Sequence, residues 1–386
     1  MKLKFIITVW GKEYIKDFNN TFLNSFDNEL TFEAVKNNLS SSSSLTIYTK
    51  ENEKDLFDNE KDLFDNERLK KINQNIKVEF KYLDNIFSKI DKSKYQFLSS
   101  VQNIIINLSH DCDYLSFVYP DFIFTKNSIY NCINLIKKNN YSAIFAPVPR
   151  VIKEKSNKVN EIIENGLNKH IKNNLHIFDK TSFTNNLRHN PSLITMCLDE
   201  FWIYKNFHIH PIILKNLNNK NYYSSFSPSI DEDFIQIYDK TKYYVAKDSD
   251  EMLFSSMTKL SEMNINFIPF NSYTFANWGN EHLRNIHLKI FKENNYILKF
   301  SNDISEDYLN REISNFEKYI KDNFFYLFLD KEILDNYYTE FKNTNTKKFI
   351  SLIRKDHYLQ KVASKLKYSM NAEEFKNKNK EFEFLI

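Results

Sequence analysis

The stretch Tyr114-Leu-Ser-Phe-Val-Tyr-Pro-Asp-Phe-Ile-Phe124 decides the fold of this chain. A run this apolar and aromatic is typical of a strand that is buried on both faces of a sheet. Pro120 lacks the amide N–H that a sheet ladder needs, so the strand is predicted to end or bulge there. Asp121 would then lie at the carboxyl end of a buried strand, where open α/β sheets bind ligands. A buried carboxylate needs a partner, and a divalent cation is one such partner.

Strands and helices are predicted to alternate on both sides of this stretch. Apolar runs predict strands at residues 5–10, 45–48, 76–80, 142–148 and 207–214. Helical spacing of apolar residues predicts helices at 13–26, 97–108 and 127–138, and residues 150–200 are predicted to be polar and helical. Because such alternation is typical of parallel sheets with right-handed crossovers, we expect an α/β fold with a mostly parallel sheet flanked by helices.

The composition excludes several function classes. The net charge is +3, from 53 basic and 50 acidic side chains, which gives no electrostatic reason to expect nucleic acid as a partner. The three glycines, Gly11, Gly166 and Gly279, are too few for a glycine-rich dinucleotide fingerprint or a P-loop. The three cysteines form no C-x-x-C pair, which argues against a disulfide scaffold or a structural zinc site and favours a cytoplasmic protein.

The 386 residues are long enough for one large core with an appended piece. We expect a nucleotide-binding and catalytic domain over residues 1–300 and a helical C-terminal extension over 301–386. Within the extension, residues 347–368 carry seven basic side chains against one acidic side chain. Two interpretations stay open for this segment: a peripheral helix at the inner face of the membrane, or a packing helix with a solvated basic face. No stretch approaches the roughly 18 apolar residues that span a bilayer.

Two acidic segments compete for the role of metal ligand. Asp111-Cys-Asp113 has the form D-x-D, a metal–nucleotide signature of many sugar transferases. It precedes the buried strand, however, in a region that is predicted to be a helix end and a turn. Asp121 is at the far end of the strand, where a ligand binds. We therefore expect Asp121, and not the Asp111/Asp113 pair, to be the functional carboxylate.

Three further constellations are candidates for chemistry. His208 and His210 would share one face of a strand, where two imidazoles can bind a cation or a phosphate. Asp231 and Asp233 alternate with Glu232, so one carboxylate could face a cleft as a metal ligand or general base. For each of these pairs a structural role is the alternative interpretation.

The third constellation is the pair Arg284 and His287. These residues lie three apart on a predicted helix and therefore share a face. Together they could hold a phosphate or pyrophosphate group. The alternative interpretation is an ordinary surface helix.

Taken in order, these segments resemble a known family. The order is I-T-V-W-G-x-E-Y from residue 7, L-T-I-Y-T from residue 45, a strand ending in P-D, then H-x-H-P, I-D-x-D and a late H-x-R-x-x-H helix. This pattern is similar to that of bacterial glycosyltransferase-like proteins of the GT-A type, which are found near polysaccharide biosynthesis loci. The resemblance covers roughly residues 3–295. It implies a GT-A-like, Rossmann-like sheet that binds a nucleotide-sugar donor.

The resemblance also implies roles for particular residues. Asp121 would hold a divalent cation, Mn²⁺ or Mg²⁺, and the donor diphosphate, with His208 or His210 assisting. Asp231 or Asp233 would be the base that deprotonates the acceptor hydroxyl. The nucleotide would be bordered by a third set of residues: Val9, Trp10 and Thr49.

The expected reaction is transfer of a sugar to a cell-surface glycan or its lipid-linked precursor. Two alternatives remain open from the sequence. One is a non-catalytic interaction protein that keeps the fold, and the other is a nucleotidyl- or phosphotransferase that uses the same carboxylates.

Overall fold

The computed structural model describes most of the first 324 residues. The described residues are 1–53, 67–84, 98, 101–102, 104–106, 109–156, 158–175, 187–190, 193–206, 209–216, 242–259 and 285–324. The chain divides into two compact units. Unit 1 comprises Met1–His176, His208–Met263 and Tyr296–Phe300, and unit 2 comprises Ile177–Phe207, Asn264–Asn295 and Ser301–Ile386.

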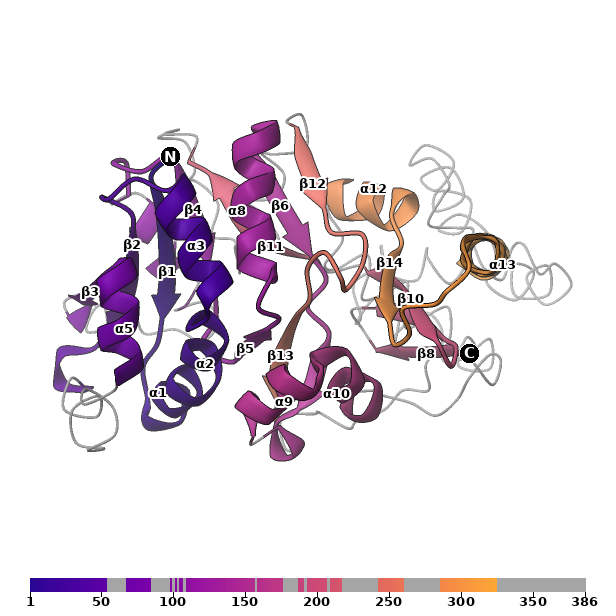
Figure 1. Cartoon of the computed structure of the whole chain (residues 1–386), viewed down its shortest axis with the longest axis horizontal. Coiled ribbons are helices and arrows are strands. Elements are labelled where there is room, and N and C mark those ends of the chain that lie inside the picture. The colour runs from indigo at the N-terminus through magenta and orange to yellow at the C-terminus, as the bar shows by residue number, and fades with distance from the viewer. Residues whose placement is uncertain are drawn as a thin grey trace, which may run out of the picture. The chain divides into compact units, whose positions relative to one another are not determined.

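A seven-stranded sheet forms the centre of unit 1, with the strand order β12-β6-β11-β4-β1-β2-β3 (Figure 1). Its strands are β1 (Leu3–Thr8), β2 (Ser44–Thr49), β3 (Lys77–Tyr82), β4 (Tyr114–Phe117), β6 (Ala143–Ala146), β11 (His210–Lys215) and β12 (Tyr243–Val245). β1 pairs in parallel with β2 and β4, β2 with β3, and β6 with β12. β11 is antiparallel to both of its neighbours, β4 and β6. The predicted α/β architecture with a mostly parallel sheet is therefore confirmed.

The central strands are buried on both faces because helices cover the sheet. Every residue of β1, β2, β4 and β6 is buried, as near-continuous apolar runs predict. Helices α5 (Glu67–Asn75), α3 (Glu29–Asn38) and α8 (Ser128–Asn139) lie in a row over one face (Figure 1). The Asn28 side chain caps α3 by accepting a hydrogen bond from the Thr31 amide over 2.9 Å. α8 ends at Asn140, which adopts a left-handed conformation with φ of 51°.

The helix predicted at 13–26 is present but is not a regular α-helix. It consists of α1 (Lys12–Asp17), the π-helical turn η1 (Phe18–Phe22) and α2 (Leu23–Phe26). The rings of Phe18 and Phe22 stack 5.8 Å apart, and those of Phe22 and Phe26 stack 5.3 Å apart. This ladder of aromatic rings packs into the core, where Phe26 also contacts Phe5 of β1 at 5.2 Å.

A second, three-stranded sheet in unit 1 has the order β5-β13-β7. Its strands are β5 (Phe122–Phe124), β13 (Phe254–Thr258) and β7 (Arg150–Ile152). The opening stretch of sequence thus supplies two strands, β4 and β5, to two different sheets. The predicted break at Pro120 is confirmed, because β4 ends at Phe117 and the chain enters β5 directly after Asp121.

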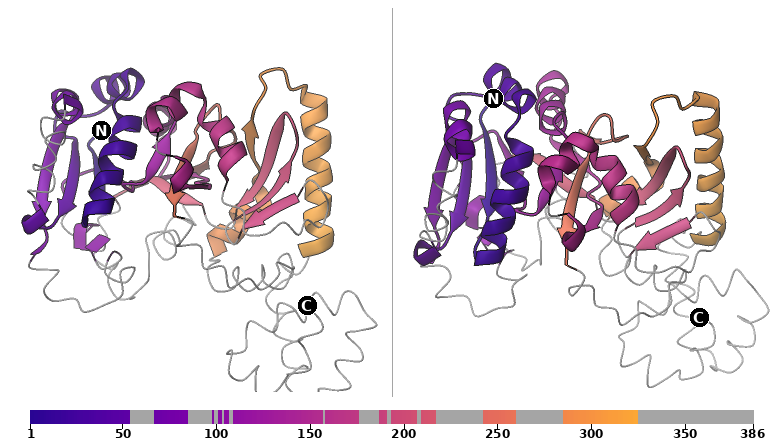
Figure 2. Two further views of the ribbon diagram at one scale, coloured as in Figure 1. Left: turned by 90° about the horizontal axis from the view of Figure 1, so that it is seen from below. Right: turned by 60° about the horizontal axis from the view of Figure 1, so that its bottom comes forward.

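Unit 2 contains three antiparallel strands and two helices. The strands are β8 (Leu187–Asn190), β9 (Leu193–Cys197) and β10 (Phe201–Asn206), and the helices are α12 (Asn285–Glu293) and α13 (Glu306–Phe324). α13 runs beside these strands, and its Tyr308 ring contacts Phe201 at 5.4 Å (Figure 2).

The prediction that residues 150–200 are helical is wrong in part. Helices α9 (Val159–Asn165) and α10 (Leu167–Asn174) occur there, but so do β7, β8 and β9. The runs at 187–190 and 193–197 are short and do not alternate between apolar and polar residues, so their strand character depends on the pairing of β8 with β9. Predicted strand 207–214 is observed as β11, which begins at His210.

The expected domain boundary at residue 300 stays a prediction, because only residues 301–324 of the proposed extension are described. The basic segment 347–368 lies outside the described residues. Among the helices that are described, none has the length and apolar character needed to cross a bilayer.

Candidate functional site

The strand order of unit 1 creates a ligand-binding position at the carboxyl ends of β1 and β4. From β1 the chain adds β2 and β3 on one side, and then returns to add β4 on the other side. The loops that follow β1 and β4 therefore diverge, which is the topological switch point where open α/β sheets bind ligands. Val9, Trp10 and Gly11 follow β1 at this edge, and Asp121 follows β4.

Asp121 is a half-buried carboxylate at the switch point. Its pKa is raised to about 6 from the ordinary value of 3.8, chiefly by burial and in smaller part by the negative charge of Asp17. The positive charges of Arg150 and Lys153 act in the opposite direction. A carboxyl group whose pKa lies close to neutral is frequently part of a functional site.

Asp17, on α1, is tied to the segment that follows β7. Its side chain is buried, and its carboxylate accepts a hydrogen bond from the Lys153 ammonium of η3 (Lys153–Lys155) over 2.5 Å. Burial raises the pKa of Asp17, and the ion pair with Lys153 lowers it. A second pair, Glu13 with Lys259, flanks the first.

Arg150 is the first residue of β7 and has an exposed side chain. The β13 strand separates it from β5: Ser256 pairs with Arg150 on one side and with Phe122 on the other. Two strand spacings, about 10 Å, therefore separate the backbone of Arg150 from that of Phe122, the residue next to Asp121. We call Asp17, Asp121, Arg150 and Lys153 the charged cluster. Of these four residues, only Asp121 is predicted from the sequence.

His210 reaches the same edge of the sheet, because β11 is antiparallel and begins where β4 and β6 end. Its side chain is buried, and its Nε2 lies 3.0 Å from the Phe117 carbonyl oxygen. The Tyr119 and Phe122 rings each contact the imidazole edge-on, with centroids 5.1 Å away. His210 therefore contacts residues on both sides of the Pro120–Asp121 turn, where it packs between aromatic rings and its Nε2 lies against a backbone carbonyl.

The three residues expected to border the nucleotide all lie at this edge. The side chains of Val9 and Thr49 are buried, whereas that of Trp10 is partly exposed. Thr49 Oγ1 is buried and has no hydrogen-bond partner among the described residues. Of the three, Trp10 thus offers side-chain surface to a ligand.

Acidic side chains connect the loops after the first three strands. Glu53 accepts a hydrogen bond from the Gly11 amide over 2.7 Å, and Asp84 accepts one from the Glu51 amide over 2.7 Å. Gly11 has φ of 84°, a left-handed conformation that favours glycine. The carboxyl edge is therefore acidic around β1–β3, and it carries the cations Arg150 and Lys153 beyond β4.

Asp111 and Asp113 lie at the opposite edge of the sheet, before β4 begins. Asp111 pairs with the ammonium groups of Lys2 at 2.5 Å and Lys4 at 3.2 Å. The hydrogen bond from Lys2 lowers the pKa of Asp111 to about 2. Asp113 accepts a hydrogen bond from the Lys2 amide over 2.8 Å. Both carboxylates of this D-x-D thus interact with the N-terminal segment, and the choice of Asp121 over them stays a prediction.

Several predicted site residues cannot be placed. His208, Asp231, Asp233 and Arg284 lie outside the described residues. His287 belongs to α12 of unit 2, but its side chain is not described. Within the described ranges, no group of three or more His, Cys, Asp or Glu side chains is arranged to hold a metal ion. Asp121 and His210 therefore do not form a complete metal site with other described residues.

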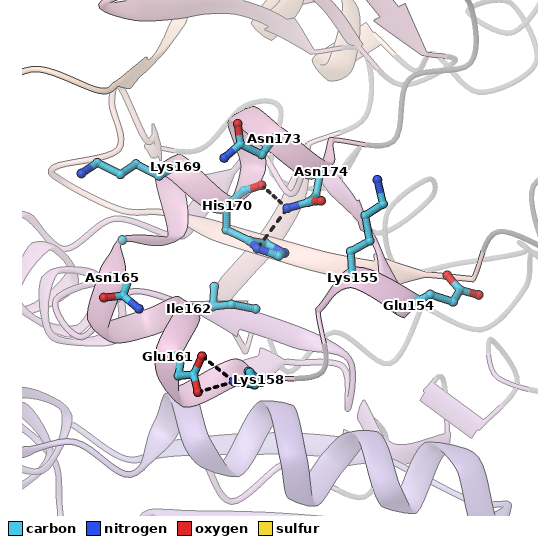
Figure 3. Close-up of a pocket in the computed structure, with 11 residues that line it drawn as sticks. Glu154, Lys155, Lys158, Glu161, Ile162, Asn165, Lys169, His170, Asn173 and Asn174 are labelled. Carbon is cyan, nitrogen blue, oxygen red and sulfur yellow. Dashed lines mark hydrogen bonds and ion pairs between the residues drawn. The ribbon is translucent and has the colours of Figure 1, made fainter.

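A cavity of about 520 Å³ lies elsewhere in unit 1, between η3, α9 and α10 (Figure 3). Its lining includes His170, whose Nε2 is 2.9 Å from Ser156 Oγ and whose Nδ1 is 3.2 Å from Asn174 Nδ2. Ser156 Oγ donates its proton to the Ile152 carbonyl oxygen, so it must accept from His170 Nε2–H. A serine that accepts from the imidazole is not activated as a nucleophile. The arrangement is therefore structural, and burial lowers the pKa of His170 accordingly.

No protein-family model matches the chain, and no curated protein sequence matches it. Among solved structures, residues 1–349 of S. aureus TarS align with 11% identity and a TM-score of 0.36, covering 95% of this chain and 90% of that chain. The same fragment in complex with UDP-GlcNAc aligns with 10% identity and a TM-score of 0.37, over the same shares of the two chains. The crystal structure titled S. aureus TarS aligns with 9% identity and a TM-score of 0.31, covering 88% of this chain and 47% of that chain. At TM-scores below 0.5, the interpretation of this chain rests on its own geometry.

Proposed function

We propose that this chain is a glycosyltransferase that moves a sugar from a nucleotide-sugar donor to a hydroxyl group of a cell-surface glycan or its lipid-linked precursor. One observation carries the proposal: a half-buried carboxylate, Asp121, lies at the switch point of a mostly parallel sheet, where the positive charges of Arg150 and Lys153 act on it. Switch points bind nucleotides, and the charged cluster supplies groups that act on a diphosphate.

The edge of the sheet is suited to the two ends of such a donor. Acidic side chains around β1–β3 accept hydrogen bonds, which is what ribose hydroxyls and base N–H groups require. The cations beyond β4 attract phosphate oxygens. The donor would thus lie with its nucleoside over β1 and β2 and its diphosphate toward Asp121. Trp10 would border the nucleoside.

The proposal also assigns roles that the described residues leave open. Asp231 or Asp233 would take the proton of the acceptor hydroxyl, and Arg284 with His287 would hold a phosphate. Asp121 with His208 or His210 would hold Mn²⁺ or Mg²⁺. For the metal, the described donor set does not fit, because it offers one carboxylate and an imidazole whose Nε2 lies against a carbonyl.

Isothermal titration of the full chain with UDP- and GDP-sugars in the presence of Mn²⁺ tests this proposal. Wild-type protein should bind at least one donor, and the Asp121→Ala variant should bind it more weakly. Asp111→Ala is the matched control, because it removes a carboxylate at the opposite edge and should leave donor binding unchanged. Absence of binding to every donor, with wild type and Asp121→Ala alike, would contradict the proposal.

Product analysis separates this reaction from its alternatives. A glycosyltransferase releases a nucleoside diphosphate, whereas a nucleotidyltransferase releases pyrophosphate and a phosphotransferase leaves a phosphorylated acceptor. A stable stoichiometric partner without any donor affinity would instead identify a non-catalytic interaction protein.

A further inference from the structure

When the sugar leaves, negative charge develops on the donor diphosphate, and a positive group must stabilise it. The charged cluster contains two candidates for this group, Arg150 and Lys153. In glycosyl transfer the bond between the anomeric carbon and the β-phosphate oxygen breaks, and its electron pair stays on the phosphate. The acceptor oxygen bonds to the anomeric carbon, and its proton passes to a carboxylate. The departing diphosphate is stabilised either by a metal ion or by basic side chains.

Two cations, Lys153 and Arg150, act on Asp121, but they differ in whether their side chains are available to bind a ligand. Lys153 is half-buried and donates to the buried Asp17 carboxylate. Moving Lys153 toward a ligand would leave that carboxylate without its ion-pair partner, which is costly. Among the described residues, Arg150 makes no side-chain hydrogen bond and no ion pair within 4 Å. Its guanidinium is exposed and still has all its donors available.

The backbone holds Arg150 firmly in place. It begins β7, where Ser256 pairs with it, and it follows Pro149, whose carbonyl oxygen accepts hydrogen bonds from the Ser255 hydroxyl at 2.7 Å and the Ser256 amide at 3.2 Å. The same β13 strand pairs with β5 next to Asp121. A planar guanidinium on this anchored backbone is suited to bidentate recognition of phosphate oxygens.

We propose that Arg150 binds the diphosphate of the nucleotide donor and stabilises the nucleoside diphosphate as it leaves. Lys153, held by Asp17, adds positive potential without leaving its ion pair. This inference rests on the proposed function and makes it more specific: diphosphate binding does not require a metal ion.

Titration calorimetry of the full chain in EDTA tests the role of Arg150, with UDP, GDP and the corresponding monophosphates as probes. Wild type should bind one of the diphosphates without metal. Arg150→Gln should weaken the binding of that diphosphate by about 10- to 100-fold, because the substitution removes charge-assisted hydrogen bonds. The same variant should change monophosphate binding much less. Arg150→Lys should fall in between, because an ammonium group keeps the charge but loses the bidentate fork.

Lys155→Gln is the matched control, because it removes the same charge from an exposed side chain that lines the separate cavity. Its diphosphate affinity should equal that of wild type, and circular dichroism should show all variants folded. Equal diphosphate affinity of Arg150→Gln and wild type would overturn the inference and leave the proposed function standing. Diphosphate binding that occurs only with Mn²⁺ would overturn it as well. Failure of wild type to bind any nucleotide with or without Mn²⁺ would contradict the proposed function itself.

Discussion

The Asp121 carboxylate is placed where its charge opposes folding. Burial raises its pKa to about 6, so the folded chain holds the proton more tightly than the unfolded chain, whose value is near 3.8. Ionised Asp121 therefore lowers the free energy of unfolding above pH 6, and this effect fades as the pH falls toward 3.8. In a fully buried group, a pKa shift of this size would lower the free energy of unfolding by about 3 kcal/mol. Because Asp121 is partly exposed, we expect a loss of about 1–2 kcal/mol.

Replacing Asp121 with Asn should therefore stabilise the protein while it weakens donor binding. Urea denaturation should show the Asn variant more stable than wild type by about 1–2 kcal/mol at pH 8, with nearly no difference at pH 4. The control is Asp111→Asn, which should give no gain at pH 8, because ion pairs with Lys2 and Lys4 already stabilise the ionised Asp111. A stabilisation by Asp121→Asn that is equal at both pH values would contradict the desolvation argument.

At the residue scale, local rules were enough to place Asp121 and not enough to find its neighbours. Pro120 ends a strand by its own chemistry, so the position of the next residue follows from sequence. Lys153 lies 136 residues from Asp17, and nothing in either local sequence marks them as partners. Arg150 follows a buried strand and two prolines, a signal that would have identified it once strand ends were considered together.

At the scale of elements, a buried ion pair joins strand β10 to helix α13 within unit 2. The Lys205 side chain is fully buried, and its ammonium lies 2.6 Å from Glu317 Oε1. Lys205 also contacts the Lys292 carbonyl oxygen at 3.3 Å and the Phe291 ring at 5.8 Å. Removing the acid alone takes the Glu317 charge away from an ammonium that stays buried, whereas replacing both groups with apolar ones removes the buried charge as well.

Glu317→Leu should accordingly destabilise unit 2 by about 3 kcal/mol, and Lys205→Met combined with Glu317→Leu should recover most of that loss. Amide hydrogen exchange in α13 measures both effects, because exchange there reports local opening of the helix. The control is Glu312→Leu, which removes an acid whose contacts are with Arg311 and Asn315 of α13 itself. Protection that is equal in Glu317→Leu and wild type would show that the buried pair does not hold the helix.

The segment 12–26 shows how far periodicity predicts an element. Phe18, Phe22 and Phe26 recur every four residues, which is correct for a helix but slightly longer than the 3.6-residue repeat of an α-helix. The π-helical turn at η1 widens the repeat, so the rings stay stacked on one side. The sequence thus predicts the helix, while the choice of a π turn depends on the packing of these rings against β1 and β5.

At the scale of the whole molecule, the compact units are discontinuous in sequence. Unit 2 joins residues 301–386 with two earlier segments, and unit 1 includes a five-residue return at Tyr296–Phe300. That return contains β14 (Tyr296–Lys299), whose Lys299 ammonium bridges Asp248 at 2.9 Å and Asp250 at 2.7 Å. Changes in composition along a chain can reveal linkers, but contacts between segments that are distant in sequence do not change the local composition. The parallel sheet was therefore predictable and the membership of the two units was not.

Binding of a nucleoside diphosphate should stabilise unit 1 selectively, because Trp10, Asp121 and Arg150, the described groups assigned to the donor, all belong to it. At a ligand concentration of 100 times Kd, the free energy of unfolding of that unit rises by about 2.7 kcal/mol. Hydrogen exchange with and without UDP or GDP should show new protection in peptides that cover residues 9–11, 119–122 and 150–153. Peptides from β8, β9, β10 and α13 of unit 2 serve as the internal control and should exchange at unchanged rates. Protection confined to unit 2 would place the nucleotide away from the switch point and would contradict the assignment of the site.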